Sequence, residues 1–168
     1  MGYREHRSQT RATAVGCAVL TVSSSRTEYN DDSGRIIREK LLQSRHRVLF
    51  YEVVEDDSRV ISTTLRGWLK NPEVQVIVTS GGTGISRKDV TIEAIVPLLE
   101  KEFTGFGELF RWLSYQEIGS ASMISRAAAG VVRGRVLFCL PGSPSACDLA
   151  MDKLIIPELA HLVWEANR

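Results

Sequence analysis

The feature that most constrains this chain is the alternation of short apolar runs with segments of helical periodicity. The runs at 13–22, 46–54 and 74–80 are rich in Val, Leu and Ile. They predict strands, and the continuous runs at 13–22 and 74–80 are typical of strands buried on both faces. Between the second and third runs, apolar residues recur four apart, as on one buried helix face. Strands that alternate with helices predict βαβ units around a mainly parallel sheet.

The second half of the chain predicts more helix and one antiparallel hairpin. We expect the glycines of 105–107 to break a helical pattern, and 108–118 to be helical again. Residues 128–140 predict a hairpin with its turn at Arg133-Gly134. A final amphipathic helix is expected to be kinked near Pro157. The predicted fold class is therefore α/β, with a mainly parallel sheet and one antiparallel hairpin.

Length and composition indicate a single globular domain. The chain has 168 residues, of which 43% are hydrophobic and 24% are charged. We predict a flexible N-terminal tail at 1–12 and one domain at 13–168. The 21 basic and 20 acidic residues give a formal net charge of +1, so no global field attracts nucleic acid. Any anionic ligand must therefore be bound by local geometry.

Several classes of site and location are disfavoured. The three cysteines and three histidines are scattered and form no CxxC motif, which argues against a disulfide framework and a zinc site. No apolar run approaches the roughly 20 residues of a membrane span. The segment 1–12 lacks the apolar centre of a secretory signal. We expect a cytoplasmic protein without a membrane partner.

Polar and glycine residues gather just after the predicted strands. They occur at Ser23–Arg26, Asp56-Asp57, Gly81–Asp89 and Pro141–Ser145. In open α/β sheets, ligands bind outside the carboxyl ends of the strands, at the point where the strand order reverses. The candidate site is expected at this edge of the sheet.

The strongest local motif is TSGGTG, at 79–84. Three glycines in four positions allow backbone N–H groups to approach a phosphate, and the following helix adds its positive end. The motif is neither a Walker A loop nor the GxGxxG of a Rossmann fold. The alternative is a tight strand-to-helix turn, for which one glycine would suffice. The candidate phosphate-binding residues are Ser80, Gly81, Gly82, Thr83 and Gly84.

Asp56 and Asp89 are candidate catalytic residues and candidate ligands of Mg²⁺. Each is also a candidate helix N-cap, for which Asp is a preferred residue. A carboxylate beside a phosphate loop repels the phosphate unless a divalent cation lies between them, and Mg²⁺ prefers carboxylate and phosphate oxygens. Spacing alone leaves both interpretations open.

Further polar segments are candidates for contacts to phosphate, ribose or base. Hydroxyls and an arginine fork suit phosphate, and a stiff turn before a helix suits a base or an anion. The simpler interpretations are a polar loop, a helix cap, a solvated pair and a rigid corner. These candidates are Ser24, Arg26, Asp32, Ser33, Ser125, Arg126, Pro141, Gly142, Ser143 and Pro144. No GxSxG motif occurs, and Cys147 is predicted to be a buried structural residue.

Four motifs together resemble the molybdopterin adenylyltransferases. They are TSGGTG with the downstream Asp89-Val90-Thr91, GFGELFR at 105–111, SRAAAG at 125–130 and LPGSPSA at 140–146. That family contains molybdenum cofactor biosynthesis proteins of the MogA and MoaB type and is similar to the G domain of gephyrin. The likeness runs from about Ala14 to Pro157, and the stretch from GFGELFR to SRAAAG is most similar to the MoaB branch.

The resemblance implies a three-layer α/β/α sandwich that transfers an adenylyl group from Mg-ATP to molybdopterin and releases pyrophosphate. It implies a homotrimer or homohexamer, and a molybdate-insertion enzyme as a further partner. By motif matching, the glycine loop binds the nucleotide's phosphates, and Asp56 and Asp89 are the two carboxylates associated with magnesium binding and catalysis. Ser24, Arg26, Asp32 and Ser33 fall in the first substrate loop, and 141–144 matches the final loop.

Two comparisons with the family's pattern bear on activity. Many members have Asp at the position of Ser25, which leaves the ligand contacts of the first loop open. Some MoaB-branch members that are thought inactive lack the first carboxylate, whereas this chain has both Asp56 and Asp89. The alternatives are a non-catalytic molybdopterin-binding or scaffold module and a CinA-like nucleotide pyrophosphatase.

Overall fold

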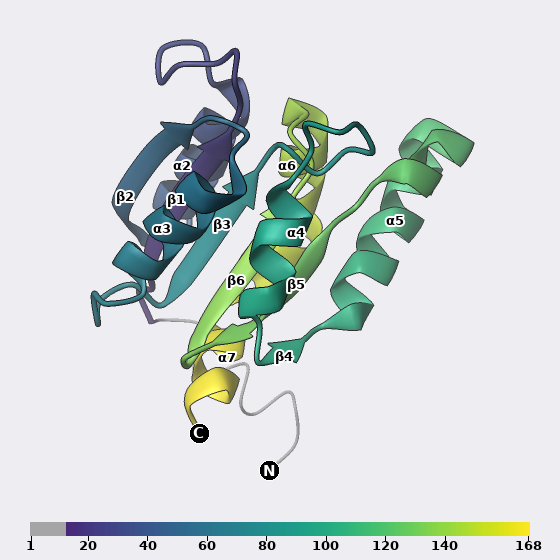
Figure 1. Cartoon of the computed structure of the whole chain (residues 1–168). Helices are drawn as coiled ribbons and strands as arrows, with labels where there is room; N and C mark the ends of the chain where they lie inside the picture. The colour runs from purple at the N-terminus through teal and green to yellow at the C-terminus, as the bar shows by residue number, and fades with distance from the viewer. Residues whose placement is uncertain (1–12) are drawn as a thin grey trace.

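A six-stranded sheet forms the middle layer of the computed structural model, which describes residues 13–168 (Figure 1). The strand order is β2-β1-β3-β6-β5-β4. The first four strands in that order are parallel, and β5 and β4 add antiparallel pairs at one edge. The strands are β1 (Gly16–Val22), β2 (Arg47–Val54), β3 (Val76–Ser80), β4 (Lys101–Glu102), β5 (Ala128–Val132) and β6 (Arg135–Leu140). The predicted mainly parallel sheet with one antiparallel hairpin is confirmed.

Helices cover both faces of the sheet, which confirms the three-layer sandwich. α3 and α4 lie in front of the sheet in Figure 1, and α2, α5, α6 and α7 pack on the other face. The longer helices are α2 (Asp32–Gln43), α3 (Ser58–Trp68), α5 (Thr104–Ile118), α6 (Pro144–Ala150) and α7 (Ile156–Asn167). The short ones are α4 (Thr91–Ile95), η1 (Val96–Leu98), η2 (Gly119–Ile124) and the π-helical η3 (Met151–Ile155). Within residues 13–168, no helix has the length and apolarity needed to cross a membrane.

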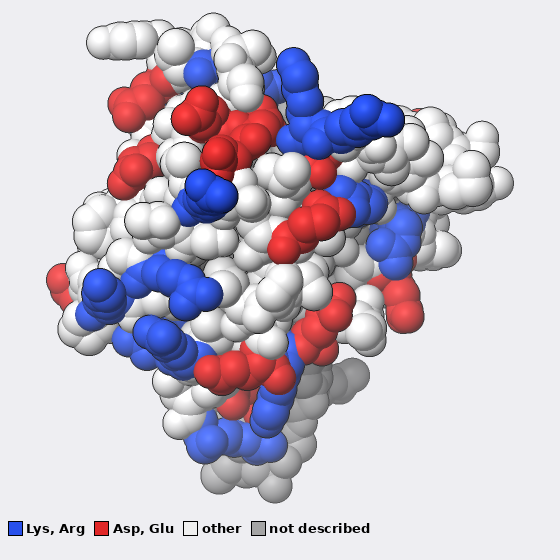
Figure 2. Space-filling view, viewed as in Figure 1, with Lys and Arg blue, Asp and Glu red and all other residues white. Residues whose placement is uncertain are grey.

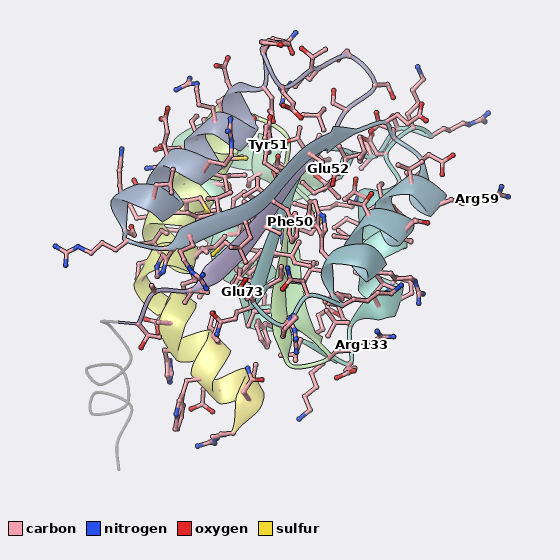
Figure 3. All side chains as sticks on the ribbon, turned by 90° about the vertical axis from the view of Figure 1, so that its left-hand side faces the viewer. Phe50, Tyr51, Glu52, Arg59, Glu73 and Arg133 are labelled. Atoms are coloured by element: carbon pink, nitrogen blue, oxygen red, sulfur yellow. The ribbon has the colours of Figure 1, made fainter. Side chains whose placement is uncertain are left out.

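Alternate residues of the central strands pack into the two halves of the core, which lie on opposite faces of the sheet. In β1, Cys17 and Val19 face the helices α2 and α6, whereas Ala18 and Leu20 face α3. The edge strand β2 departs from this alternation at a bulge, because the consecutive residues Leu49 and Phe50 both pack on the α3 side. Figure 3 views the molecule from that edge. Phe50 stacks on Trp68 of α3 at 5.8 Å between ring centroids. The period of two gives the central strands β1, β3 and β6 two apolar faces, as the continuous runs at 13–22 and 74–80 predicted for β1 and β3.

The hairpin forms where the sequence predicted it. Arg133 and Gly134 have φ values of 50° and 72°, the left-handed pair that a tight two-residue hairpin turn requires. The strand β4 was not predicted, and it extends the hairpin through pairing with β5.

The predicted break at 105–107 is wrong, because these residues lie inside α5. Phe106 and Phe110 are one turn apart on the buried face of this helix, and the Phe106 ring packs 5.2 Å from that of Phe138. A Cβ at Gly107 would lie 2.8 Å from the Ala127 carbonyl oxygen, so glycine permits close packing of the helix against the chain before β5. Apolar burial therefore outweighs the low helix propensity of glycine.

The final helical segment is interrupted next to Pro157, as predicted. The π turn Met151–Ile155 lies between α6 and α7, and Pro157 occupies the first turn of α7. Proline has no N–H to continue the α-helical ladder, so the preceding turn widens. The predicted tail at 1–12 lies outside the described residues.

Candidate functional site

A hollow of about 670 Å³ opens at the carboxyl ends of the parallel strands. Its volume is in the range of small-molecule and cofactor sites. Three loops that are far apart in the sequence meet there with Asp56 and Lys88. The lining residues are Val22, Ser23, Ser24, Ser25, Arg26, Asp56, Gly81, Gly82, Lys88, Gly142, Ser143 and Pro144. The sequence predicted this meeting of loops, but it did not single out Lys88.

The glycine turn after β3 requires glycine at two positions. Gly81 and Gly82 have φ values of 93° and 63°, which L side chains rarely adopt. A Cβ at Gly81 would overlap the Val22 carbonyl oxygen, and one at Gly142 would lie 3.0 Å from the Gly81 α-carbon. The first, middle and last loops are therefore packed backbone against backbone, and Gly81 and Gly82 face the hollow without side chains.

Arg126 holds the glycine turn from outside the hollow. Its Nε donates to the Thr83 carbonyl oxygen at 2.9 Å, and its Nη2 donates to that of Gly84 at 2.8 Å. Its Nη1 forms an ion pair with Glu93 at 2.5 Å, and the hydrogen bond to Arg126 lowers the pKa of that carboxyl group. The donors of Arg126 are thus engaged within the protein. Ser125 also lies outside the lining residues, and its N–H donates to the Ser122 carbonyl oxygen.

Asp56 lines the hollow and does not cap the next helix. Asp57 is the N-cap of α3, because its Oδ1 accepts from the N–H groups of Arg59 and Val60. Oδ2 of Asp56 accepts from the N–H and the hydroxyl of Ser24, at 2.8 and 2.7 Å. Its Oδ1 has no hydrogen-bond partner among residues 13–168, and it lies next to Gly82. A carboxylate oxygen left unpaired beside open space fits Mg²⁺, which takes one or two carboxylates together with phosphate oxygens.

Asp89 lies beside the glycine turn but does not line the hollow. Its Oδ2 accepts from the Ser86 N–H at 2.8 Å, and a Cβ at Gly84 would lie 2.7 Å from that oxygen. The hydrogen bonds from Ser86 and the nearby Arg126 guanidinium lower the pKa of Asp89, so the group is ionised at neutral pH. It is not the cap of α4, whose N-cap residue is Val90. In residues 13–168, no three His, Cys, Asp or Glu side chains are grouped to hold a metal, so a cation would need substrate oxygens.

The first loop is tied to the last one through Arg26 and Ser33. Arg26 Nη1 donates to the Gly142 carbonyl oxygen at 3.0 Å and to Ser33 Oγ at 3.2 Å. Ser33 Oγ donates to the same Gly142 oxygen at 2.7 Å. Both residues thus hold the two loops together, and Arg26 also lines the hollow. Among the other predicted residues, Ser24, Ser143 and Pro144 line it, whereas Ser80, Thr83, Gly84 and Pro141 are next to lining residues in the sequence but do not line it themselves.

A buried carboxylate that the sequence analysis missed supports this link. Asp31 is fully buried and accepts from the hydroxyls of Thr21 and Tyr51, at 2.5 and 2.8 Å, and from the Gly34 N–H. Its Oδ1 lies 3.7 Å from Arg26 Nη1. The predicted Asp32 instead points away from this network and pairs with Arg35 on the surface at 3.0 Å. The signal for Asp31 was its position as N-cap, three residues before Gly34.

Charges of both signs gather at the end of the molecule where the hollow opens. Figure 2 shows acidic side chains beside basic ones in the upper part of the view. Within the hollow itself, Asp56 lies with the cations Arg26 and Lys88. Cys147 behaves as predicted for a structural residue, because burial raises the pKa of its thiol to about 12. The site therefore offers backbone amides, hydroxyls, one open carboxylate and two cations, which suits a polyphosphate with its metal ion.

Comparison with known proteins identifies the family. The family model described as a probable molybdopterin binding domain matches residues 18–161. The chain belongs to the MoaB/MogA family. Molybdenum cofactor biosynthesis protein B of Bacillus cereus is 46% identical over 169 residues, which cover 100% of this chain and 99% of that protein. The resemblance to the MoaB branch is therefore confirmed.

Solved structures of the MoaB/MogA family share the fold. A crystal structure of a molybdenum cofactor biosynthesis protein B is 47% identical, with a TM-score of 0.89 over 92% of this chain and 96% of that one. The tungsten cofactor synthesizing protein MoaB of Pyrococcus furiosus is 38% identical, with a TM-score of 0.85 over 93% of this chain and 99% of that one.

Proposed function

We propose that this protein transfers an adenylyl group from Mg-ATP to molybdopterin, giving adenylyl-molybdopterin and pyrophosphate. The single observation that carries the proposal is the hollow in which the glycine turn meets the unpaired Oδ1 of Asp56. Membership of the MoaB/MogA family, whose model is named for molybdopterin binding, supports the pterin as second substrate. The relatives named for molybdenum cofactor biosynthesis support the same pathway.

The glycine turn would bind the triphosphate of ATP. Gly81 and Gly82 carry no side chain, so their backbone can approach phosphate oxygens directly. Lys88 lines the same hollow and supplies an exposed positive charge, whereas Arg26 is held by its contacts to Gly142 and Ser33. The last loop, at Ser143 and Pro144, then faces the remaining space and would contact the second substrate.

The reaction is an in-line displacement at the α-phosphorus of ATP. An oxygen of the terminal phosphate of molybdopterin forms a bond to the α-phosphorus, and the bond from that phosphorus to the α,β-bridging oxygen breaks. Pyrophosphate leaves with the electron pair of the broken bond, so no side chain need act as nucleophile. Positioning and neutralisation of charge supply most of the rate in such transfers.

Asp56, through Oδ1 next to Gly82, and Asp89, next to Gly84, would together hold magnesium against the phosphates of ATP. Bound magnesium neutralises charge on the phosphates of ATP. Ser24 fixes the rotamer of Asp56 through two hydrogen bonds to Oδ2. Arg126 and Glu93 keep the carbonyl groups of Thr83 and Gly84 turned away from the phosphates, which favours N–H donors there.

The test is incubation with molybdopterin, ATP and Mg²⁺, followed by quantification of adenylyl-molybdopterin and pyrophosphate. Formation of both in equal amounts, dependent on all three components, supports the proposal. Pterin binding without ATP consumption would identify a non-catalytic module. Release of AMP from a nucleotide without the pterin would identify a CinA-like pyrophosphatase.

We further propose that the protein is a homo-oligomer, a trimer or a hexamer. Six large apolar side chains are more than half exposed on α5 and η2. At the upper right of the view, where α5 ends and η2 begins, Figure 2 shows a largely uncharged surface. They are Leu109, Trp112, Tyr115, Ile118, Met123 and Ile124, and we call them the α5 stripe. An exposed apolar surface of this kind is typical of an interface between copies.

A further inference from the structure

One buried hydroxyl beside the candidate site has no hydrogen-bond partner. Among residues 13–168, only Thr79 and Thr91 have a buried side-chain oxygen without a partner. Thr91 is fully buried at the start of α4, and it follows the glycine turn. Buried polar groups are nearly always paired, so an orphaned one at a site requires an explanation.

The Thr91 hydroxyl lies directly under the glycine turn. The Thr91 N–H donates to the Gly82 carbonyl oxygen at 2.9 Å, which fixes the start of α4 to the turn. The position where a Cβ of Gly82 would be built is in contact with Thr91 Oγ1 and lies 3.0 Å from Asp56 Oδ1. The Thr91 hydroxyl therefore lies against Gly82, which itself lines the hollow.

Asp56 Oδ1 and Thr91 Oγ1, the two oxygens near Gly82 that have no partner among residues 13–168, need opposite kinds of ligand. Asp56 Oδ1 is an acceptor that suits a cation, whereas the Thr91 hydroxyl carries a hydrogen that needs an acceptor. Phosphate oxygens are strong acceptors, and the proposed function brings them to the glycine turn. A glycine can shift its backbone with little steric cost, so a bound polyphosphate can uncover the hydroxyl.

We propose that Thr91 is a nucleotide-binding residue, whose hydroxyl donates to a phosphate oxygen of ATP when the glycine turn moves around the bound nucleotide. This inference rests on the proposed function, because it takes Mg-ATP as the ligand. It explains why the hydroxyl has no partner among residues 13–168: the acceptor is part of the substrate.

The experiment compares Thr91→Val with the parent protein in two measurements, the calorimetric Kd for Mg-ATP without molybdopterin and the melting temperature. Val matches Thr in shape and replaces the hydroxyl with a methyl group. We expect the Kd to rise about tenfold, the effect of losing one hydrogen bond to a charged acceptor. We expect the melting temperature to stay the same or rise, because the hydroxyl has no partner among residues 13–168.

Thr79→Val is the matched control. Thr79 has the other unpaired hydroxyl, but it lies inside β3 and does not line the hollow, so its loss should leave the Kd for Mg-ATP unchanged. An unchanged Kd in Thr91→Val overturns the inference. A lower melting temperature with an unchanged Kd would show that water pairs with the hydroxyl instead.

If Thr91→Val weakens both binding and stability, the pair Thr91→Ser and Thr91→Ala decides, since these variants differ only in the hydroxyl. Binding about tenfold tighter in the Ser variant supports the inference, and equal binding overturns it. If the parent protein itself binds no Mg-ATP, the proposed function fails together with the inference. If the parent binds and Thr91→Val binds equally well, only the inference fails.

Discussion

Asp56 and Asp57 are adjacent in the sequence but have different environments. Asp57 accepts two backbone N–H groups at the start of α3, whereas Asp56 accepts from Ser24 and presents its other oxygen beside Gly82. The first arrangement stabilises a helix end, and the second leaves a ligand position open. Substitutions at the two positions should therefore have different consequences.

We expect Asp56→Asn to reduce adenylyl transfer by about 100-fold or more, the effect of losing a pre-organised charge, and to leave the melting temperature nearly unchanged. Asp57→Ala is the matched control. It should lower the free energy of unfolding by about 1 kcal/mol, through loss of the cap, and preserve turnover. Turnover and urea unfolding of both variants check this. Loss of stability alone in Asp56→Asn would argue against a metal ligand.

Asp89→Asn should also reduce turnover by about 100-fold or more while the fold is kept. The pKa of Asp89 is lowered in the folded protein, so its ionised form stabilises the fold above the ordinary pKa of 3.8, and this contribution is lost as the pH falls through the lower folded value. The difference in melting temperature between parent and variant should therefore be largest near neutral pH and shrink below about pH 4. Near-normal turnover in this variant would refute the proposed role.

The sequence could identify the residue types of the site but not every position. Asp31 and Asp32 are equally polar in the sequence, and only the phase of α2 decides that Asp31 is buried under Arg26 while Asp32 faces solvent. Lys88 was missed because nothing in a run of basic residues shows which one reaches the hollow. The unpaired Thr91 hydroxyl results from packing alone.

The helix α5 contains two glycines that are two residues apart and differ in their surroundings. Gly107 packs against the Ala127 carbonyl oxygen, 2.8 Å from where its Cβ would be, whereas nothing lies within 4 Å of the corresponding position at Gly105. Gly107→Ala should lower the free energy of unfolding by about 1–3 kcal/mol, because the helix must move away from the sheet. Gly105→Ala should raise it by up to about 1 kcal/mol through helix propensity.

Urea unfolding of the two variants measures this difference. Equal effects would mean that α5 does not pack on the chain before β5 as described. The comparison also shows why the sequence alone misplaced the start of α5: glycine commonly breaks helices, and its use for close packing depends on a neighbour, Ala127, that is twenty residues away. The strands and the hairpin were predicted more reliably, since their apolar runs and turn residues are local features.

The assembly of the molecule depends on the α5 stripe. Trp112 belongs to the α5 stripe and is 59% exposed. Trp112→Glu should therefore place a charge in the proposed interface between copies. We expect light scattering to show a smaller species for this variant than for the parent protein. Glu117→Lys, on the same helix but outside the stripe, is the control and should keep the parent's mass. A monomeric parent would contradict the proposed oligomer.

The strands β1 and β3 are neighbours in the sheet, but the chain leaves them in opposite directions, toward α2 on one face and α4 on the other. The loop after β1 and the loop after β3 therefore lead to opposite faces of the sheet, and a crevice opens between them at the carboxyl ends of the strands. The position of the substrate-binding site therefore follows from the strand order and the connections of the sheet. Substitutions in the loops can change which ligand the site binds, while the position of the site in the fold stays the same.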